Sequence, residues 1–370
     1  MLVRPGNLNY HLQKFSVNRF IAIIFTLTVV SLFCIMHSSM STHIPVSSPP
    51  RDFHFEYEVL KGYFKQSEDE TDDVSFDFIE EEFGLIERDY DVDFDGEEDE
   101  KELSRWRRFE NHVRTLDKKS NDGESVKVLF LGRHGQGWHN VAETKYGTEA
   151  WDCYWSMLDG ADGMTWSDAN LTEVGQRQAK DVHGLWKKLL PKGLPPPETH
   201  YVSPMTRTIE TADLSFKGLE LPGGKAYKPL IKELSREALG VHTCDRRSPA
   251  SHLLSTFPHI TLEPGFSEPD PLWEPDYREP RSARKYRLSQ FLDDVFANDE
   301  GVFLSLTSHS GAIGSILEAV KHRTFALQTG GVIPVLVRAK RVEGERKRPP
   351  KEPSEGPPAC KEPPTTLLNY

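Results

Sequence analysis

The stretch Val126–Asn140, "VKVLFLGRHGQGWHN", decides the fold of this chain. Its apolar run "VLFL" leads directly into "GRHG", which contains Arg133 and His134. A short apolar run without alternation is typical of a strand buried on both faces of a parallel sheet. An Arg-His pair after such a strand is ordinarily a polar loop, so its meaning depends on what the other strand ends carry.

The rest of this region alternates short apolar runs with amphipathic segments. Strands are predicted over Val126–Leu131, Thr199–Ser203 and Val302–Thr307. Helices are predicted over Thr172–Leu190, after Pro204, over Arg281–Asn298 and over Ser310–Lys321. Thr172 is the expected N-cap of the first helix, whose inward face should carry Val174, Val182, Leu185, Trp186 and Leu189. This alternation predicts an α/β fold, a three-layer α/β/α sandwich with a mostly parallel central sheet.

Composition separates this domain from the rest of the 370 residues. The net charge is −12, but Ser67–Glu102 alone holds 19 acidic and 2 basic residues. Without that segment the chain carries a net charge of +5, so the fold itself suits an anionic ligand. The four cysteines are scattered with no CxxC pair, which argues against a zinc framework and a disulfide-rich scaffold. No nucleic-acid partner and no metal site are expected.

The amino-terminal region predicts a membrane anchor. Residues 1–19 form a leader with three basic residues, and Phe20–Met36 is an uncharged apolar run of 17 residues. No Lys or Arg follows before Arg51. The positive-inside rule then predicts a single-pass type II protein with a lumenal or extracellular domain. The alternatives are a secreted protein with a cleaved signal peptide, or a cytoplasmic one if the segment does not insert.

Three further regions flank or make up the domain. Residues 37–102 should be a Ser/Pro stalk and a mostly disordered acidic arm, although an arm packing its interleaved aromatics on the core is the alternative. Residues 103–343 should be the folded domain, entered by a helix whose inward face holds Trp106, Phe109, Val113 and Leu116. Residues 344–370 are basic and then proline-rich, and a disordered tail is predicted.

Three predicted strands end in residues suited to an oxyanion. The first ends in "GRHG", the second in "SPMTRT" with Arg207, and the third in "LTSHSG" with His309. Ligands of such sheets bind beyond the carboxyl ends of the strands. Two arginines, two histidines and the starts of two helices would fit a phosphoryl group, which Arg133 would bind and His134 would attack. The glycine spacing GxxGxG does not match a dinucleotide loop.

Together the motifs resemble a known family. "RHGQGWHN", "SPMTRTIETA" and "LTSHSG" are similar to the histidine phosphatase (phosphoglycerate mutase-like) superfamily. "LSREALGVHTCDRR", Leu234–Arg247, resembles the fungal phosphomutase-like branch. The resemblance covers about Val126–Val337.

The resemblance implies a role for each matching residue. His134 becomes the phosphohistidine. Arg133, Asn140, Arg207 and His309 bind the phosphoryl oxygens. Glu237 stands where the family has the acid that protonates the leaving oxygen and then deprotonates water; an ordinary surface carboxylate, or confusion with Asp245 or Arg236, is the alternative. The implied mechanism needs no metal or other cofactor.

Departures from the family favour one activity over another. Gly137 replaces a Ser or Thr of the first motif, and Ser310-Gly311 replaces the mutase Gly-Asn. The expected function is therefore hydrolysis of phosphomonoesters of small metabolites through a phosphohistidine. The alternatives are a phosphomutase and a catalytically idle phosphate-binding domain. Arg246 and Arg247 would bind a second anionic group of the substrate, or form a solvated basic turn.

Overall fold

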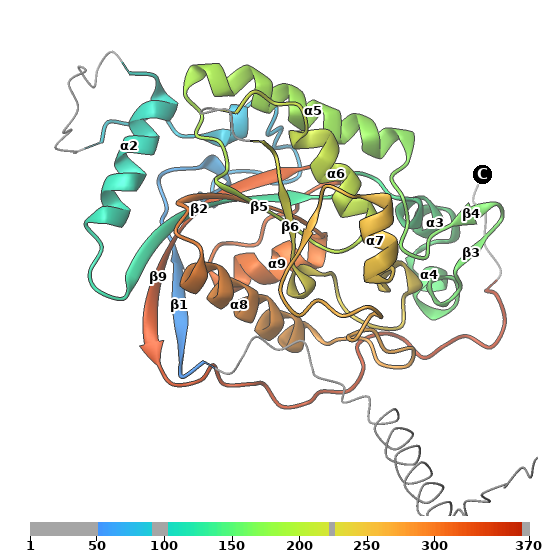
Figure 1. Ribbon diagram of the computed structural model, residues 1–370. Coiled ribbons are helices and arrows are strands. Elements are labelled where there is room, and N and C mark those ends of the chain that lie inside the picture. The colour runs from blue at the N-terminus through green and yellow to red at the C-terminus, as the bar shows by residue number, and fades with distance from the viewer. Residues whose placement is uncertain (1–50, 91–102, 222–225, 365–370) are drawn as a thin grey trace, which may run out of the picture. The chain divides into compact units, whose positions relative to one another are not determined.

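A seven-stranded sheet forms the centre of the computed structural model, which describes residues 51–90, 103–221 and 226–364 (Figure 1). Its strand order is β1-β9-β2-β8-β5-β6-β7. The strands are β1 Phe53–Val59, β2 Glu124–Arg133, β5 Thr199–Val202, β6 Pro229–Ile231, β7 Thr261–Leu262, β8 Phe303–Ser308 and β9 Val332–Glu343. Strands β2, β8, β5, β6 and β7 are parallel, and β9 is antiparallel to both of its neighbours. The predicted mostly parallel α/β fold is confirmed.

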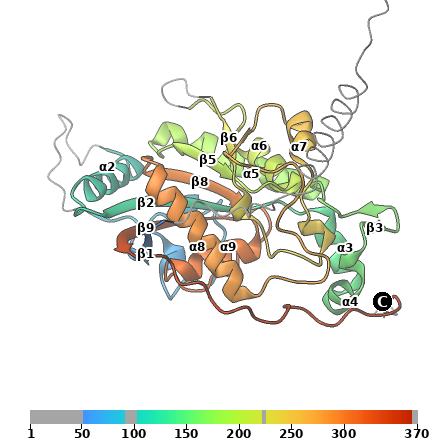
Figure 2. The ribbon, with the colours of Figure 1, turned by 60° about the horizontal axis from the view of Figure 1, so that its bottom comes forward.

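Helices cover both faces of the sheet. They are α2 Arg105–Lys118, α3 Trp138–Tyr146, α4 Thr148–Cys153, α5 Glu173–Leu189, α6 Thr206–Phe216, α7 Ala250–Thr256, α8 Arg281–Asn298 and α9 Ser310–Ala319. Helices α2 and α5 bury aromatic and aliphatic side chains on one face, and α8 and α9 do so on the other. Figure 2 shows α8 and α9 side by side. A small hairpin, β3 Gly160–Ala161 and β4 Met164–Thr165, lies outside the main sheet.

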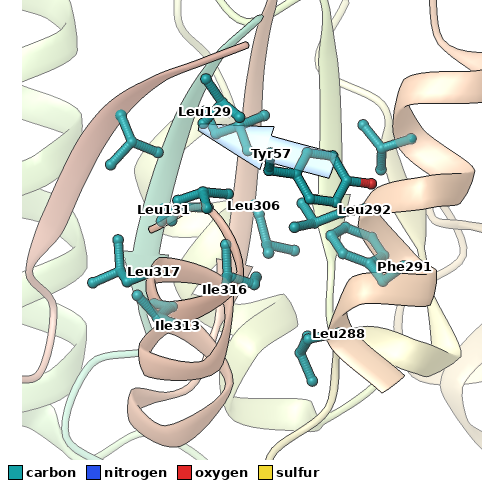
Figure 3. Packing of buried hydrophobic residues seen from close by; sticks show 14 of the residues in the cluster. Tyr57, Leu129, Leu131, Leu288, Phe291, Leu292, Leu306, Ile313, Ile316 and Leu317 are labelled. Atoms are coloured by element: carbon teal, nitrogen blue, oxygen red, sulfur yellow. The ribbon is translucent and has the colours of Figure 1, made fainter. Parts of the chain in front are cut away.

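Strand β2 shows why the opening stretch decides the fold. Its side chains alternate between two apolar clusters: Leu129 and Leu131 face α8 and α9, whereas Val128 and Phe130 face α2 and α5. Because both faces are covered, the strand reads as a continuous apolar run rather than an alternating one. Figure 3 shows Leu129 and Leu131 among side chains of the α8 and α9 layer.

Helix α5 follows its predicted bounds closely. Thr172 is the N-cap, and its Oγ1 accepts a hydrogen bond from the Gly175 N–H at 3.1 Å. Val182, Leu185, Trp186 and Leu189 are buried as predicted. Val174 is 39 % exposed, so its inward placement was wrong. Position 174 lies in the first turn of α5.

The acidic arm differs from the prediction of disorder. Residues 53–59 are the edge strand β1, paired along its whole length with β9. Phe78, Phe83 and Leu85 are buried on the α2 and α5 face, with Phe83 packed edge-on against Phe130. The free energy gained by burying these apolar side chains offsets the repulsion among the neighbouring carboxylates, which stay at the surface. Residues 37–50 and 91–102 of the predicted stalk and arm lie outside the described residues.

The carboxyl-terminal tail is also attached to the domain, as far as Cys360. A disulfide joins Cys360 to Cys153 at the end of α4, and Arg346 forms an ion pair with Asp293. The Glu355 N–H donates to the Arg278 carbonyl at 2.9 Å. The basic and proline-rich composition predicted disorder. Composition cannot indicate a disulfide between cysteines 207 residues apart, nor hydrogen bonds to a distant part of the backbone.

The membrane prediction is corrected. In residues 51–90, 103–221 and 226–364, no helix has the length and apolar character to cross a bilayer. The segment Phe20–Met36, on which the anchor rested, lies outside the described residues. The membrane partner, the signal anchor and the type II lumenal placement therefore have no support.

Candidate active site

The three predicted strand ends meet at one edge of the sheet. Strand β8 lies between β2 and β5, so the residues that follow these strands are neighbours. The His134 N–H donates to the Ser308 carbonyl at 3.0 Å, and the Ser203 N–H donates to the Thr307 carbonyl at 3.0 Å. Arg207 is in the first turn of α6, which begins shortly after β5. The structure thus brings Arg133, His134, Arg207 and His309 together as the sequence predicted.

His134 is held with one ring nitrogen free to react. Its Nδ1 lies 2.7 Å from the Gly135 carbonyl oxygen. A carbonyl only accepts, so Nδ1 carries the proton and Nε2 keeps its lone pair. The side chain is 3 % exposed, and burial together with the Arg207 charge holds the His134 pKa well below its usual range. The neutral, nucleophilic form of the imidazole is therefore favoured.

His309 is tied to Arg207. Its Nδ1 accepts from Arg207 Nη2 at 3.2 Å, and its Nε2–H donates to Ser203 Oγ at 2.8 Å. Burial and the Arg207 charge lower its pKa well below the usual value. With both nitrogens occupied, His309 orients Arg207 in this arrangement, and its direct contact with a phosphoryl oxygen stays a prediction.

Arg207 is buried and clamped by the loop that follows Glu237. Its Nη1 donates to the Cys244 carbonyl at 2.6 Å, and its Nη2 donates to Asp245 at 3.0 Å. The second oxygen of Asp245 pairs with Arg278 at 2.8 Å. Burial alone would raise the Asp245 pKa, but Arg278 and Arg207 outweigh it, so the pKa lies below its usual range. Asp245 is therefore an anion that positions Arg207, which makes it unsuitable as a proton donor.

The arginines retain donors for an oxyanion. Within the described residues, the buried Nε–H groups of Arg133 and Arg207 have no hydrogen-bond partner. Arg133 is anchored through Nη1, which donates to the Leu327 carbonyl at 2.8 Å. Asp245 and Glu237 are the carboxylates at this edge, and Arg284 lies 3.8 Å from Glu237. Four arginines (Arg133, Arg207, Arg278 and Arg284) against these two carboxylates leave two positive charges, which matches a phosphoryl group carrying two negative charges.

The Glu237 carboxylate lies at the same edge of the sheet and contacts the backbone of Gly311. Its Oε2 accepts from the Gly311 N–H at 2.7 Å, at the start of α9, and its Oε1 accepts from the Ala238 N–H at 2.9 Å. A Cβ on Gly311 would lie 2.3 Å from Oε1, so only glycine lets the carboxylate sit there. Arg287 on α8 fixes the loop by donating to the carbonyls of Leu234, Arg236 and Glu237.

Asn140 has a structural bond that the sequence did not indicate. Its Oδ1 accepts from the Gly137 N–H at 3.0 Å at the start of α3, which shapes the loop after His134. A carboxamide anchored by its oxygen can still offer its NH₂ to an oxyanion. The predicted contact of Asn140 with a phosphoryl group stays a prediction.

His139 was missed by the sequence reasoning. Its ring centroid is 5.2 Å from that of His134, and it is 9 % exposed with Nδ1 unpartnered among the described residues. A Cβ on Gly137 would lie 2.7 Å from that Nδ1. The His139 ring thus occupies the space where a side chain at position 137 would lie. A second histidine five residues after the first was the available signal.

Two groups of residues near the site could in principle bind an ion: the arginines at 246 and 247, and the cluster of His242, Cys244 and Asp245. Arg247 is buried and paired with Glu233, so it is not free for a second anion. Arg246 is partly exposed and forms an ion pair with the exposed Asp159. His242, Cys244 and Asp245 have ligand atoms within 4.8 Å of one another. Both oxygens of Asp245 already face arginines, and a metal cation there would be repelled.

Comparison with known proteins agrees with this geometry. A family model described as "Histidine phosphatase superfamily (branch 1)" matches residues 159–329, which include Arg207, Glu237 and His309. A protein of Arthroderma benhamiae, "Probable phosphoglycerate mutase", is 51 % identical over 282 residues, which cover 76 % of this chain and 84 % of that protein. "Phosphomutase-like protein 3" of Candida albicans is 39 % identical over 220 residues, 59 % of this chain and 67 % of that protein.

Solved structures include one of a putative alpha-ribazole-5'-P phosphatase from Escherichia coli. It is 15 % identical, covers 61 % of this chain and 99 % of its own, and has a TM-score of 0.34. The relative that is half identical over most of both chains, with the three motifs gathered at one sheet edge, settles the family. The protein belongs to the histidine phosphatase superfamily, in its fungal phosphomutase-like branch.

Proposed function

We propose that this protein hydrolyses phosphomonoesters through a phosphohistidine on His134. One observation carries the proposal: the Nδ1–H of His134 is bound by the Gly135 carbonyl, which leaves Nε2 as a neutral nucleophile beside Arg207. In the first step Nε2 forms a bond to phosphorus while the bond to the leaving oxygen breaks. Arg133 and Arg207 bind the charge on the phosphoryl oxygens.

Glu237 is proposed to serve both proton transfers. It protonates the leaving oxygen in the first step, since an alkoxide leaves poorly without a proton. In the second step it takes a proton from the water that attacks phosphorus, and the bond from phosphorus to His134 breaks. Asp245, the other candidate acid, is held as an anion by two arginines and has no proton to give.

A mutase activity is the second candidate, because relatives carry names such as "Probable phosphoglycerate mutase". Hydrolysis is favoured because Gly311 stands where the mutase motif has asparagine, and its missing side chain makes room for the Glu237 carboxylate.

The test measures, with the purified full-length protein, whether the phosphoryl group is released as inorganic phosphate or transferred to another hydroxyl. A phosphatase releases inorganic phosphate from a phosphomonoester without a bisphosphorylated primer, and His134→Asn abolishes release. Glu237→Gln should slow alkyl phosphate turnover by roughly two to four orders of magnitude and affect nitrophenyl phosphate much less. Interconversion of phosphoglycerates without phosphate release would overturn the proposal in favour of a mutase.

A further inference from the structure

A cavity of about 320 Å³ lies beside the candidate active site. Its wall includes Arg133, which precedes the nucleophile, and Ser310, which follows His309. The Gly330 N–H donates to the His134 carbonyl at 3.0 Å, so the loop before β9 is attached to the catalytic loop. The cavity therefore adjoins the place where the phosphoryl group would bind.

The acidic arm builds one side of this cavity. Asp73, Val74, Phe76 and Phe78 line it. The Phe76 ring packs edge-on against Phe325 with centroids 6.0 Å apart. Asp73 accepts a hydrogen bond from the Ala326 N–H at 2.6 Å. These two contacts connect the arm to the loop before β9 and close the wall.

The lining is mainly apolar. Beyond the arm, it contains Phe325, Leu327 and Val332. Arg133 is the one cation among the lining residues in the described part of the chain, and its charge is needed for the phosphoryl group. Among the arm residues that line the cavity, Asp73 carries the charge, and it lies within a segment of high negative charge. A second anionic group on a substrate would be repelled here.

We propose that this cavity binds the leaving group of the substrate, and that the leaving group is uncharged and apolar, an alkyl or aromatic alcohol. The proposal rests on the phosphatase function proposed above. It also gives the acidic arm a role, as the wall that selects the substrate. At about 30 Å³ per non-hydrogen atom, the cavity has room for on the order of ten such atoms.

The test uses a series of alkyl phosphates, from methyl through propyl to hexyl phosphate. Their leaving oxygens have nearly the same basicity, so differences in kcat/KM report binding of the chain. Each added methylene should raise kcat/KM by about three- to fourfold, as burial of a CH₂ group predicts. Glycerol phosphate and 3-phosphoglycerate, with polar or anionic leaving groups, should react no faster than propyl phosphate.

Val74→Lys tests the wall with little risk to folding, because Val74 is 85 % exposed. It should lower the ratio of hexyl to methyl phosphate turnover at least about threefold, the effect of one methylene. Leu254→Lys, at an exposed apolar residue of α7 that does not line the cavity, is the matched control and should keep the ratio.

The possible outcomes separate this inference from the function on which it rests. Hydrolysis of all the phosphates at one rate, or a preference for 3-phosphoglycerate, would overturn the apolar leaving group and leave the phosphatase intact. An unchanged ratio in Val74→Lys would remove the arm from the site. Absence of phosphate release from every member would refute the proposed function itself.

Discussion

Gly311→Ala should separate the role of Glu237 from the stability of the fold. The added Cβ would lie 2.3 Å from Glu237 Oε1 and 3.0 Å from Arg284 Nη1. Ordinary contact needs about 3.5 Å, so the carboxylate must withdraw by roughly 1 Å. It then loses its hydrogen bond from the Gly311 N–H.

The size of the effect follows from this displacement. Misplacing a catalytic group by about 1 Å costs on the order of a hundredfold in rate. Turnover of an alkyl phosphate should therefore fall about 10²-fold, whereas nitrophenyl phosphate, whose leaving group needs no proton, should lose less than about tenfold. Alanine is better than glycine in a helix by about 1 kcal/mol, which offsets part of the lost hydrogen bond of about 1.5–3 kcal/mol.

Gly314→Ala is the matched control. It lies in the same helix, and a Cβ there meets no atom within 4 Å. It should gain helix stability and keep full activity. Steady-state kinetics with both substrates and urea unfolding of both variants make the comparison. Equal losses for the two leaving groups in Gly311→Ala, or a similar loss in Gly314→Ala, would refute the placement of Glu237 as the proton donor.

Three further predictions concern stability. Burial lowers the pKa values of His134 and His309 in the folded protein, so the unfolded chain binds more protons than the folded one. The free energy of unfolding should therefore fall as the pH drops below about 6.5, by up to about 1.4 kcal/mol per pH unit for each histidine. Urea unfolding at several pH values checks this, and a flat profile would contradict it. Cys360→Ser should cost about 2–5 kcal/mol through loss of the disulfide, measured against the wild type without reductant. Phe83→Ala should cost about 3–5 kcal/mol, as for a fully buried core residue; a change under 1 kcal/mol would mean that the arm is not part of the core.

The parallel sheet and the helices on it were predictable because their patterns are local. The unbroken apolar run of β2 and the 3.6-residue period of α5 and α8 each reflect burial against a neighbour. The carboxyl ends of parallel strands share an edge, so the neighbourhood of His134, Arg207 and His309 followed from the topology.

The arm and the tail were not predictable because their order depends on partners distant in sequence. β1 alternates buried and exposed residues, but the carboxylates that follow dominate any average over the segment. Its partner β9 lies more than 270 residues further along the chain. The pairing of Cys153 with Cys360 cannot be chosen from four scattered cysteines.

The residue types that gather at this edge of the sheet were predicted, and the hydrogen bonds between them were not. Nothing in the sequence indicates that His309 uses both nitrogens on protein partners, or that Asp245 bridges Arg207 and Arg278. These contacts depend on the conformations of the segments that follow β5, β6 and β8, which carry no periodic signal. The departure at Gly137 was visible, but its filling by His139 needs coordinates.

The phosphohistidine is the central claim, and rapid-quench labelling tests it most directly. Purified protein is mixed with a ³²P-labelled alkyl phosphate, quenched in alkali within milliseconds, digested and mapped by mass spectrometry. The label should be stable in base, labile in acid and located on His134, and His134→Asn should carry none. Label on a serine, aspartate or other histidine, or phosphate release by His134→Asn at the wild-type rate, would contradict the account.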